Sequence, residues 1–455
     1  MQREITALWE KKKVVLRQTP RAVPPFGGRS VFLDFLTKIG FREQVHRDRP
    51  VHLPAPNAIE AAQRFTAFLV SVVAGARRFA HAGRLRADRA LHAVLGRKRF
   101  PSDGTIRNLF KRFTQGMVVR LDEPRWAWQR ERLPKRVGGY RLDLDSTVFA
   151  RYGKQEGVKK GYNPRQPGRG SHHPRRAVLG EAYFILHGGR RSGNTTAGRG
   201  VGEFLQEALA KREGLAWIRG VRADAGFLAQ ELLKYLEEIQ RPYIVVARLT
   251  RWLKREAARV KAGRALEAIY AVGEFQLPLW GWDRARRFVV VREQRRETKR
   301  SPGRKLFEVP SYTFRVFVTN RPHPSEEIWR DDHQRVPRGG MEQRIEEVKS
   351  DLAADPFCRQ AFFATEAAFL SILMLFNLLG EFQRARGMTG YRPPARLRVQ
   401  VFLCGAILGR AGHRTVLHLW AAWGGLEKRN SRFDNLLLYE IPTSRKLEIQ
   451  PHAGG

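Results

Sequence analysis

Apolar and polar residues alternate between residues 140 and 145 of the chain. The six positions are Tyr140, Arg141, Leu142, Asp143, Leu144 and Asp145. A period of two predicts a β-strand whose apolar side chains face one way and whose two carboxylates face the other. The pattern is typical of a strand inside a core, where an unpaired carboxylate is costly. We therefore expect a bound metal ion to compensate the charge.

Helical periodicity dominates the region before this strand. One helix is predicted to begin at Asn57, with Glu60 as its reciprocal capping partner. Another is predicted to begin at Ser102 or Asp103. Their apolar faces are Phe65, Phe68, Leu69 and Val72 in the first helix, and Ile106, Leu109, Phe110 and Phe113 in the second. The surrounding surface is rich in arginine. The region therefore resembles a helix-turn-helix-like DNA reader, although a basic face that contacts solvent alone gives the same pattern.

After Arg136 strands and helices alternate, which predicts a mixed α/β sheet. The predicted strands are Gly180–His187, Ala216–Val221 and Tyr243–Leu249, and the predicted helices are Phe204–Lys211 and Phe227–Ile239. From about residue 250 to 325 the helical signal fades, and strands are predicted at Ile269–Leu279, Arg287–Val291 and Tyr312–Thr319. Helices are predicted again at Met341–Leu352, Ala361–Arg384 and the apolar group Leu397–Leu408. We expect two domains, a helical basic region over residues 1–136 and an α/β domain over residues 137–455 with a β-rich insertion.

Several features bear on the compartment. The most apolar stretch, Ala361–Leu379, contains Glu366 and Asn377, which favours a buried helix over a membrane span. No secretory signal is expected, because residues 1–19 carry scattered charges. The two cysteines, Cys358 and Cys404, form no CxxC pair. They argue against a zinc site or a disulfide framework and fit a reducing cytoplasm.

Charge narrows the class of partner. The 455 residues include 84 Lys and Arg against 44 Asp and Glu, a formal net charge of +40, while 42% hydrophobic content supports real cores. Such an excess of positive side chains, which repel one another, indicates a polyanionic partner, most often nucleic acid. The alternative explanation is an organism whose proteins are generally rich in arginine.

Two further carboxylates could complete a site with Asp145. Asp224 ends a predicted strand, and Gly226 after it permits a tight turn. Glu342 lies near the start of a predicted helix and shares its face with Lys349, seven residues later. Three acidic residues on two strands and a helix could hold a pair of divalent cations. Hard oxygen ligands favour Mg²⁺, with Mn²⁺ as a substitute.

Structural roles remain open for the same carboxylates. Asp143 could be a hydrogen-bonded structural residue, and Asp145 is preferred as the ligand because a Ser-Thr pair follows it. Asp224 could instead cap the end of its strand. Glu342 could instead interact with the dipole of its own helix.

These residues resemble the DDE-type insertion-sequence transposases of the Tyr-Arg-Glu-Lys subclass. The motifs that carry the resemblance are Asp145-Ser-Thr, Asp224-Ala-Gly-Phe, Glu342 between Arg338 and Lys349, Tyr152-Gly-Lys-Gln-Glu-Gly157, Gly161-Tyr-Asn-Pro164, Gly168-Arg-Gly-Ser-His-His-Pro174 and Arg191-Ser-Gly-Asn194. The resemblance covers roughly residues 100–385. It implies an RNase H-like fold, an inserted β-domain between the second Asp and the Glu, and Mg²⁺-dependent cut-and-paste DNA transposition. It also implies that Asp145, Asp224 and Glu342 are the catalytic, metal-binding residues.

The resemblance assigns DNA contacts as well. Arg338 and Lys349 would hold phosphates near the cut. The subclass has a tyrosine three residues before its arginine, where this chain has Arg335. Arg335 could take over the phosphate contact of this tyrosine, or it could indicate a copy of the transposase with weakened activity. Trp280 and Trp282 could stack on a flipped base, as in hairpin-forming relatives, or pack in a core.

Two histidines of the glycine- and arginine-rich loop, His172 and His173, form a tempting pair for a metal. We expect them to pack the loop or contact DNA instead.

Chemistry at such a site would free a 3′-hydroxyl at the element's end, which would then attack the opposite strand or target DNA. We therefore predict a transposase that cuts and joins double-stranded DNA at terminal inverted repeats. We expect a homodimer in the active complex and a cytoplasmic location, on a bacterial nucleoid. Two alternatives stay open: a non-catalytic DNA-binding protein derived from such an enzyme, and a plain Mg²⁺-dependent nuclease of the same fold.

Overall fold

The computed structural model describes residues 2–6, 13–17, 19, 21–48, 51–53, 58–211, 217–260, 265–267, 270–279, 281–294, 312–333, 346–388 and 390–420. These residues form two compact units. The first, called here the helical unit, lies within Met1–Arg112, Asp351–Pro356 and Glu381–Thr443. The second, called the sheet unit, lies within Phe113–Ser350 and Phe357–Gly380.

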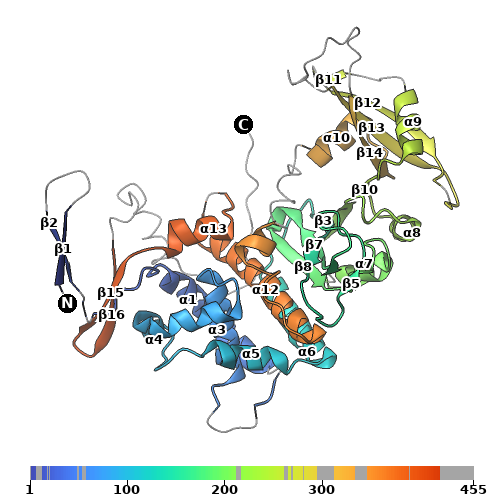
Figure 1. Ribbon diagram of the computed structural model, residues 1–455. Coiled ribbons are helices and arrows are strands. Elements are labelled where there is room, and N and C mark those ends of the chain that lie inside the picture. The colour runs from blue at the N-terminus through green and yellow to red at the C-terminus, as the bar shows by residue number, and fades with distance from the viewer. Residues whose placement is uncertain are drawn as a thin grey trace. The chain divides into compact units, whose positions relative to one another are not determined.

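Short helices make up most of the helical unit (Figure 1). They are α1 Arg29–Lys38, α2 Phe41–Asp48, α3 Ala61–Val73, the 3₁₀ helix η1 Phe79–Ala87, α4 Arg89–Val94, α5 Asp103–Lys111, α13 Pro394–Leu397 and the π-helical segment η4 Arg398–Phe402. Two hairpins accompany them, β1 Gln2–Thr6 with β2 Lys13–Arg17 and β15 Ala406–Ala411 with β16 Arg414–Leu419. The helix expected from Leu397 onward is therefore a short helical segment followed by a strand.

The core of the helical unit is rich in phenylalanine. Phe68, Phe79 and Phe110 pack together, with the ring centroids of Phe68 and Phe110 4.7 Å apart. The predicted apolar faces of α3 and α5 are confirmed, because all eight predicted residues are buried, although Phe113 follows the end of α5. The predicted cap of α5 is also confirmed, since Ser102 Oγ accepts a hydrogen bond from the Thr105 amide at 3.1 Å.

The start of α3 was predicted too early. The helix begins at Ala61, and Glu60 at its N-cap makes no side-chain capping bond. Asn57 lies outside the described residues. Capping propensity identified a helix start nearby but did not fix its position, because several polar residues precede the apolar face.

One sheet of nine strands organises the sheet unit (Figure 1). Its order is β11-β12-β13-β14-β10-β9-β3-β7-β8. The strands are β3 Tyr140–Ser146, β7 Arg175–Leu179, β8 Phe184–Gly189, β9 Ile218–Ala223, β10 Tyr243–Val246, β11 Ala265–Glu267, β12 Tyr270–Leu277, β13 Arg286–Gln294 and β14 Tyr312–Thr319. β3, β9 and β10 are parallel to one another, and the other strand pairs are antiparallel. The predicted mixed α/β sheet is confirmed.

The second predicted strand of this sheet was wrong at its start. Gly180–His187 was expected as one strand, but Gly180–Ala182 forms a 3₁₀ turn between β7 and β8. Tyr183 ends the turn with a left-handed backbone, φ 50°. β7 was missed because its sequence begins with two arginines, which do not look like core residues until their partners are known.

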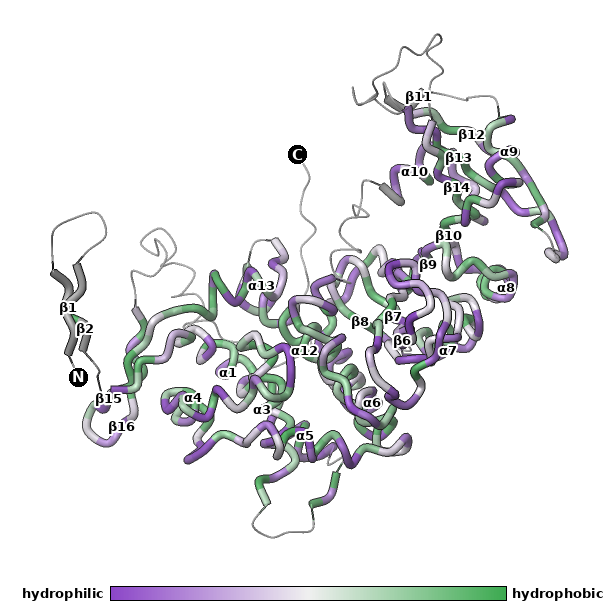
Figure 2. Tube along the Cα trace, viewed as in Figure 1, coloured by the Kyte–Doolittle hydropathy of each residue, from purple (hydrophilic) through white to green (hydrophobic). Residues whose placement is uncertain are grey.

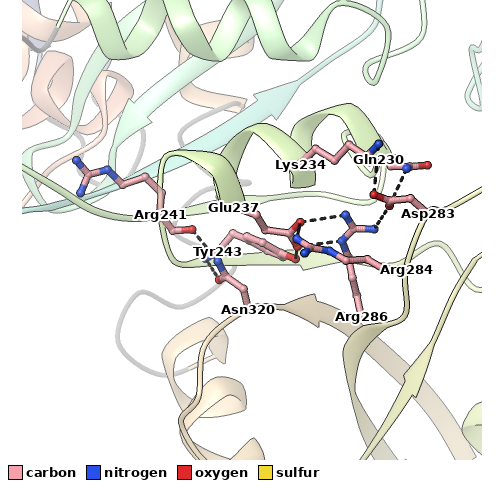
Figure 3. A network of polar contacts seen from close by, with 9 residues as sticks. All are labelled: Gln230, Lys234, Glu237, Arg241, Tyr243, Asp283, Arg284, Arg286 and Asn320. Atoms are coloured by element: carbon pink, nitrogen blue, oxygen red, sulfur yellow. Dashed lines mark hydrogen bonds and ion pairs between the residues drawn. The ribbon is translucent and has the colours of Figure 1, made fainter.

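Strands β12 to β14 extend the sheet beyond β10. A group of polar contacts joins this extension to the helix α8, Gln230–Glu238 (Figure 3). The Glu237 carboxylate accepts hydrogen bonds from Arg286 at 2.9 Å and from the Tyr243 hydroxyl at 2.8 Å, and it also pairs with Arg284. The three strands predicted here are present, but two helices were missed, α9 Arg251–Arg259 and α10 Ser325–His333.

Further helices accompany the sheet, α6 Gln115–Arg130, α7 Val201–Ala210 and the long α12 Phe362–Ala385. By length and composition α12 could cross a membrane, yet 89% of its most apolar window is buried within the protein. Figure 2 shows the mainly hydrophobic colour of this helix. The Asn377 side chain on α12 accepts a hydrogen bond from the Ile185 amide at 2.8 Å and donates one to the Ile185 carbonyl at 3.0 Å. These contacts fix α12 against β8 as a core helix.

Candidate active site

The carboxyl ends of two neighbouring parallel strands bring Asp145 and Asp224 together. In the register of β3 and β9, Leu144 lies opposite Ala223. Asp145 and Asp224 each follow by one position, so they lie side by side at the same edge of the sheet. Polar residues at this edge of a parallel pair commonly form binding sites. Asp145 is buried and Asp224 is half-buried.

The surroundings of Asp145 disfavour its charged form. The pKa of Asp145 is raised to about 7. Burial is the main cause and the charge of Asp224 adds to it, while the charge of Arg176 lowers the pKa in part. Arg176 lies opposite Asp145 on β7, and its guanidinium donates to Asp145 Oδ2 at 2.8 Å. One carboxylate oxygen therefore has a fixed cationic partner. A divalent cation between the two aspartates would relieve both the burial cost and the mutual repulsion.

Asp143, two residues earlier on the same face of β3, has different partners. Its Oδ1 accepts hydrogen bonds from Arg222 Nε at 2.8 Å and from Arg141 Nε at 3.1 Å. Its side chain is almost completely buried. Two guanidinium groups thus occupy this carboxylate within the sheet, which favours a structural role for Asp143.

A tight turn holds Asp224 at the end of β9. Asp224 Oδ1 accepts a hydrogen bond from the Gly226 amide at 2.8 Å. A Cβ at residue 226 would lie 3.1 Å from that oxygen and 3.2 Å from Ala197 Cβ. Glycine at this position therefore lets the turn pack closely against the segment that contains Ala197.

Arg175, beside Arg176 on β7, fixes that segment in turn. The Arg175 guanidinium donates to the carbonyl of Gly200 at 2.8 Å and to that of Thr196 at 3.1 Å, and also to those of Ala197 and Arg199. Sequence reasoning missed both arginines of β7. The sequence feature that could have indicated them is a pair of arginines directly before an apolar run. An apolar run is unusual in an exposed segment, so it suggests a buried strand.

Lys349 lies close to the end of β3. It belongs to the π-helical segment η3, Glu347–Asp351, and its Nζ donates to the Val148 carbonyl at 3.3 Å. Val148 is three residues after Asp145. The structure thus brings Lys349 to the same edge of the sheet as the two aspartates.

Other predicted site residues lie outside the described part of the chain. They are Glu342, Arg335, Arg338 and Trp280. Among the described residues, no group of three or more His, Cys, Asp or Glu side chains is arranged to hold a metal ion. Asp145 and Asp224 supply two hard oxygen donors, the chemistry that Mg²⁺ and Mn²⁺ prefer, and a third ligand would have to come from elsewhere.

Trp282 and His172 both have packing partners. Trp282 is half-buried, its ring stacks on Phe288 at 6.1 Å, and the Arg286 guanidinium lies 5.0 Å from its centre. His172 is buried, and its Nδ1 lies 2.6 Å from Arg190. Burial and nearby guanidinium groups lower the pKa of His172 to about 3. In this structure His172 packs the loop, as expected.

A comparison with protein-family models identifies one family. The family model described as transposase DDE domain group 1 matches residues 10–432. A solved structure titled as a piggyBac transposase synaptic complex with hairpin DNA is similar with a TM-score of 0.41 and 10% sequence identity, covering 95% of this chain and 91% of that chain. No curated protein matches the sequence significantly.

Proposed function

The chain belongs to the transposase DDE domain group 1 family, and we propose that it cuts and joins DNA at the ends of an insertion sequence. Divalent metal dependence is general in DDE transposases. The observation that carries the proposal is the pairing of Asp145 and Asp224 at adjacent parallel strand ends, with Lys349 at the same edge. We infer that these strands belong to an RNase H-like core, as the resemblance to the Tyr-Arg-Glu-Lys subclass implies.

In this proposal Asp145, Asp224 and Glu342 hold two divalent cations, with Mg²⁺ as the natural metal. When bound, the metal supplies an activated nucleophile and stabilises the leaving oxygen of the phosphodiester. The chain's own residues prepare the site. Arg176 orients Asp145 through one carboxylate oxygen.

Basic residues supply the DNA contacts in this proposal. Lys349 and Arg338 hold phosphates beside the cut, and Arg335 takes the place of the subclass tyrosine with a planar, two-pronged donor. Trp280 and Trp282 remain candidates for base stacking, which for Trp282 would require release from Phe288. The basic helical region, residues 1–136, binds the terminal repeats. The active form is a homodimer in the cytoplasm, on the nucleoid of a bacterium.

A cleavage and joining assay tests this function. The substrate is a plasmid that carries the DNA flanking both ends of this gene, incubated with the full-length chain and Mg²⁺. We expect cuts at the element ends and transfer of those ends into a second plasmid. Cutting without joining would identify a plain nuclease. Binding without cutting would identify a non-catalytic DNA-binding protein.

A further inference from the structure

Residues 149–172, which follow β3, form a small three-stranded sheet that is called here the hairpin. It carries an exposed tyrosine on a basic surface. Residues 151–170 contain six Lys or Arg and a single acidic residue, Glu156. Its three short strands are β4 Phe149–Ala150, β5 Lys159–Lys160 and β6 Gly170–His172, in the order β4-β6-β5. The region around β6 has mainly hydrophilic colours (Figure 2). Such a surface fits a polyanion.

Tyr152 is held in a defined orientation although it is 74% exposed. Gln166 Nε2 donates to the Tyr152 hydroxyl at 3.1 Å, and the Arg169 guanidinium lies 4.3 Å from the centre of its ring. The backbone of Gln166 is itself fixed, because its N–H donates to Oδ1 of the buried Asn163 at 3.1 Å. The ring is therefore pre-organised, and little conformational entropy would be lost when a flat group stacks on it.

The hairpin encloses a hollow beside this ring. The hollow is shallow and open to solvent, and it is lined by Arg151, Tyr152, Pro167, Gly168, Arg169 and Gly170. The exposed Lys159 and Lys160 lie on β5, next to β6. Cations beside an exposed aromatic ring are the two elements of a single-strand nucleic-acid site.

The hairpin is a direct continuation of the candidate active site. The Thr147 amide donates to the Pro174 carbonyl at 3.1 Å, and the Arg151 amide donates to the Gly170 carbonyl at 2.9 Å. Tyr152 is seven residues after Asp145. Seven residues of strand span at most about 23 Å, the length of roughly seven nucleotides of stacked DNA.

We propose that Tyr152 is a stacking platform for an unpaired DNA base within about seven nucleotides of the phosphodiester that is cut, with Arg169 behind the ring. The proposal rests on the proposed function and adds a substrate feature to it. A paired base is covered on both faces by its neighbours, so only an unpaired or flipped base offers a face to the ring. The lysines of β5 would hold the adjoining phosphates.

Binding measurements without divalent cation test this proposal independently of cleavage. The full-length chain is titrated with a fluorescent single strand of about eight nucleotides and with a fully paired duplex of the same sequence, both at raised salt. Tyr152→Ala should weaken single-strand binding about tenfold, a change that corresponds to about 1.4 kcal/mol. It should change duplex binding less than about twofold.

Three other variants assign the effect to the ring. Tyr152→Phe keeps the ring but loses the hydrogen bond from Gln166, so it should lose much less single-strand binding than Tyr152→Ala. Tyr152→Leu should be as weak as Tyr152→Ala. Tyr312→Ala, which removes an exposed tyrosine from β14, should have no effect. Equal weakening of single strand and duplex by Tyr152→Ala would overturn the proposal and indicate a phosphate contact. No weakening, or a loss in Tyr152→Phe as large as in Tyr152→Ala, would also overturn it. If the parent binds the single strand in this way but cuts no DNA, the proposed function fails while the platform stands.

Discussion

Two aspartates on one face of β3 differ in what surrounds them. Asp143 accepts hydrogen bonds from two guanidinium groups inside the sheet. Asp145 has Arg176 on one side and the second aspartate, Asp224, on the other. The alternating pattern of the sequence places both carboxylates on one face but cannot tell them apart, because Arg222 and Arg176 come from other strands. Only the Ser-Thr continuation favoured Asp145.

Removing the Asp143 carboxylate should destabilise the fold without removing the chemistry. Asp143→Ala removes the carboxylate that the buried guanidinium groups of Arg141 and Arg222 share, so we expect a loss of about 3–5 kcal/mol in the free energy of unfolding. Denaturant titration measures this loss. Glu238→Ala, which removes an exposed carboxylate of α8, is the control and should leave stability nearly unchanged.

The folded fraction of Asp143→Ala should still cut DNA, whereas Asp145→Ala should not. A stable but inactive Asp143→Ala variant would contradict this assignment and make Asp143 the ligand.

At the scale of elements, α12 carries a buried carboxylate that the proposed chemistry does not use. Burial raises the pKa of Glu366 to about 7, while the charge and the amide of Arg190 lower it. Both carboxylate oxygens accept hydrogen bonds from the Arg190 amide, at 3.0 and 3.1 Å. Glu366 thus joins α12 to the segment after β8 and is protonated in the folded chain more readily than in the unfolded chain.

This difference predicts a pH-dependent stability. Between pH 4.5, the ordinary pKa of a glutamate, and about 7, the unfolded chain has released this proton and the folded chain retains it. Stability should therefore fall as pH rises through this window, by roughly 3 kcal/mol. Asp145, whose pKa is also raised to about 7, adds a fall of its own in the parent and in the variant. Glu366→Gln should therefore reduce the fall by the share of Glu366 and be more stable than the parent above pH 7. Unfolding curves at several pH values test this.

Glu238→Gln, at an exposed position of α8, is the matched control and should keep the pH dependence of the parent. If Glu366→Gln has the same dependence as the parent, Glu366 is already charged in the folded chain.

The elements that sequence predicted well are those with a clear period. The two-residue alternation identified β3, and the apolar positions at helical spacing identified the buried faces of α3 and α5. β7 was missed because the burial of Arg175 and Arg176 depends on partners from other parts of the chain. Arg175 donates to backbone carbonyls and Arg176 donates to the carboxylate of Asp145. The helix α9 was missed because two buried residues, Leu253 and Ala257, give too small an apolar face.

At the scale of the whole molecule, the net charge of +40 should dominate the affinity for DNA. Each neutralised phosphate releases condensed counterions, so the logarithm of the binding constant should fall with the logarithm of salt concentration. We expect a slope of about −5 or steeper for a duplex of arbitrary sequence, measured by fluorescence anisotropy. The matched control is the same titration with an uncharged peptide-nucleic-acid duplex, which should not bind. A slope shallower than about −2 would mean that the excess charge is not directed at DNA.

The central claim is that Asp224 and Asp145 bind a catalytic metal ion together. Asp224 is half-buried at a strand end, and its Oδ1 accepts the hydrogen bond from the Gly226 amide, which an asparagine at this position can also accept. The most direct measurement compares DNA cleavage by Asp224→Cys in Mg²⁺ and in Mn²⁺, with Asp224→Asn as the control. A thiolate is a poor ligand for Mg²⁺ and a better one for softer ions, so we predict no cleavage in Mg²⁺ and partial recovery in Mn²⁺. Asp224→Asn should be inactive in both ions. Cleavage by Asp224→Cys in Mg²⁺ at the rate of the parent would contradict the claim.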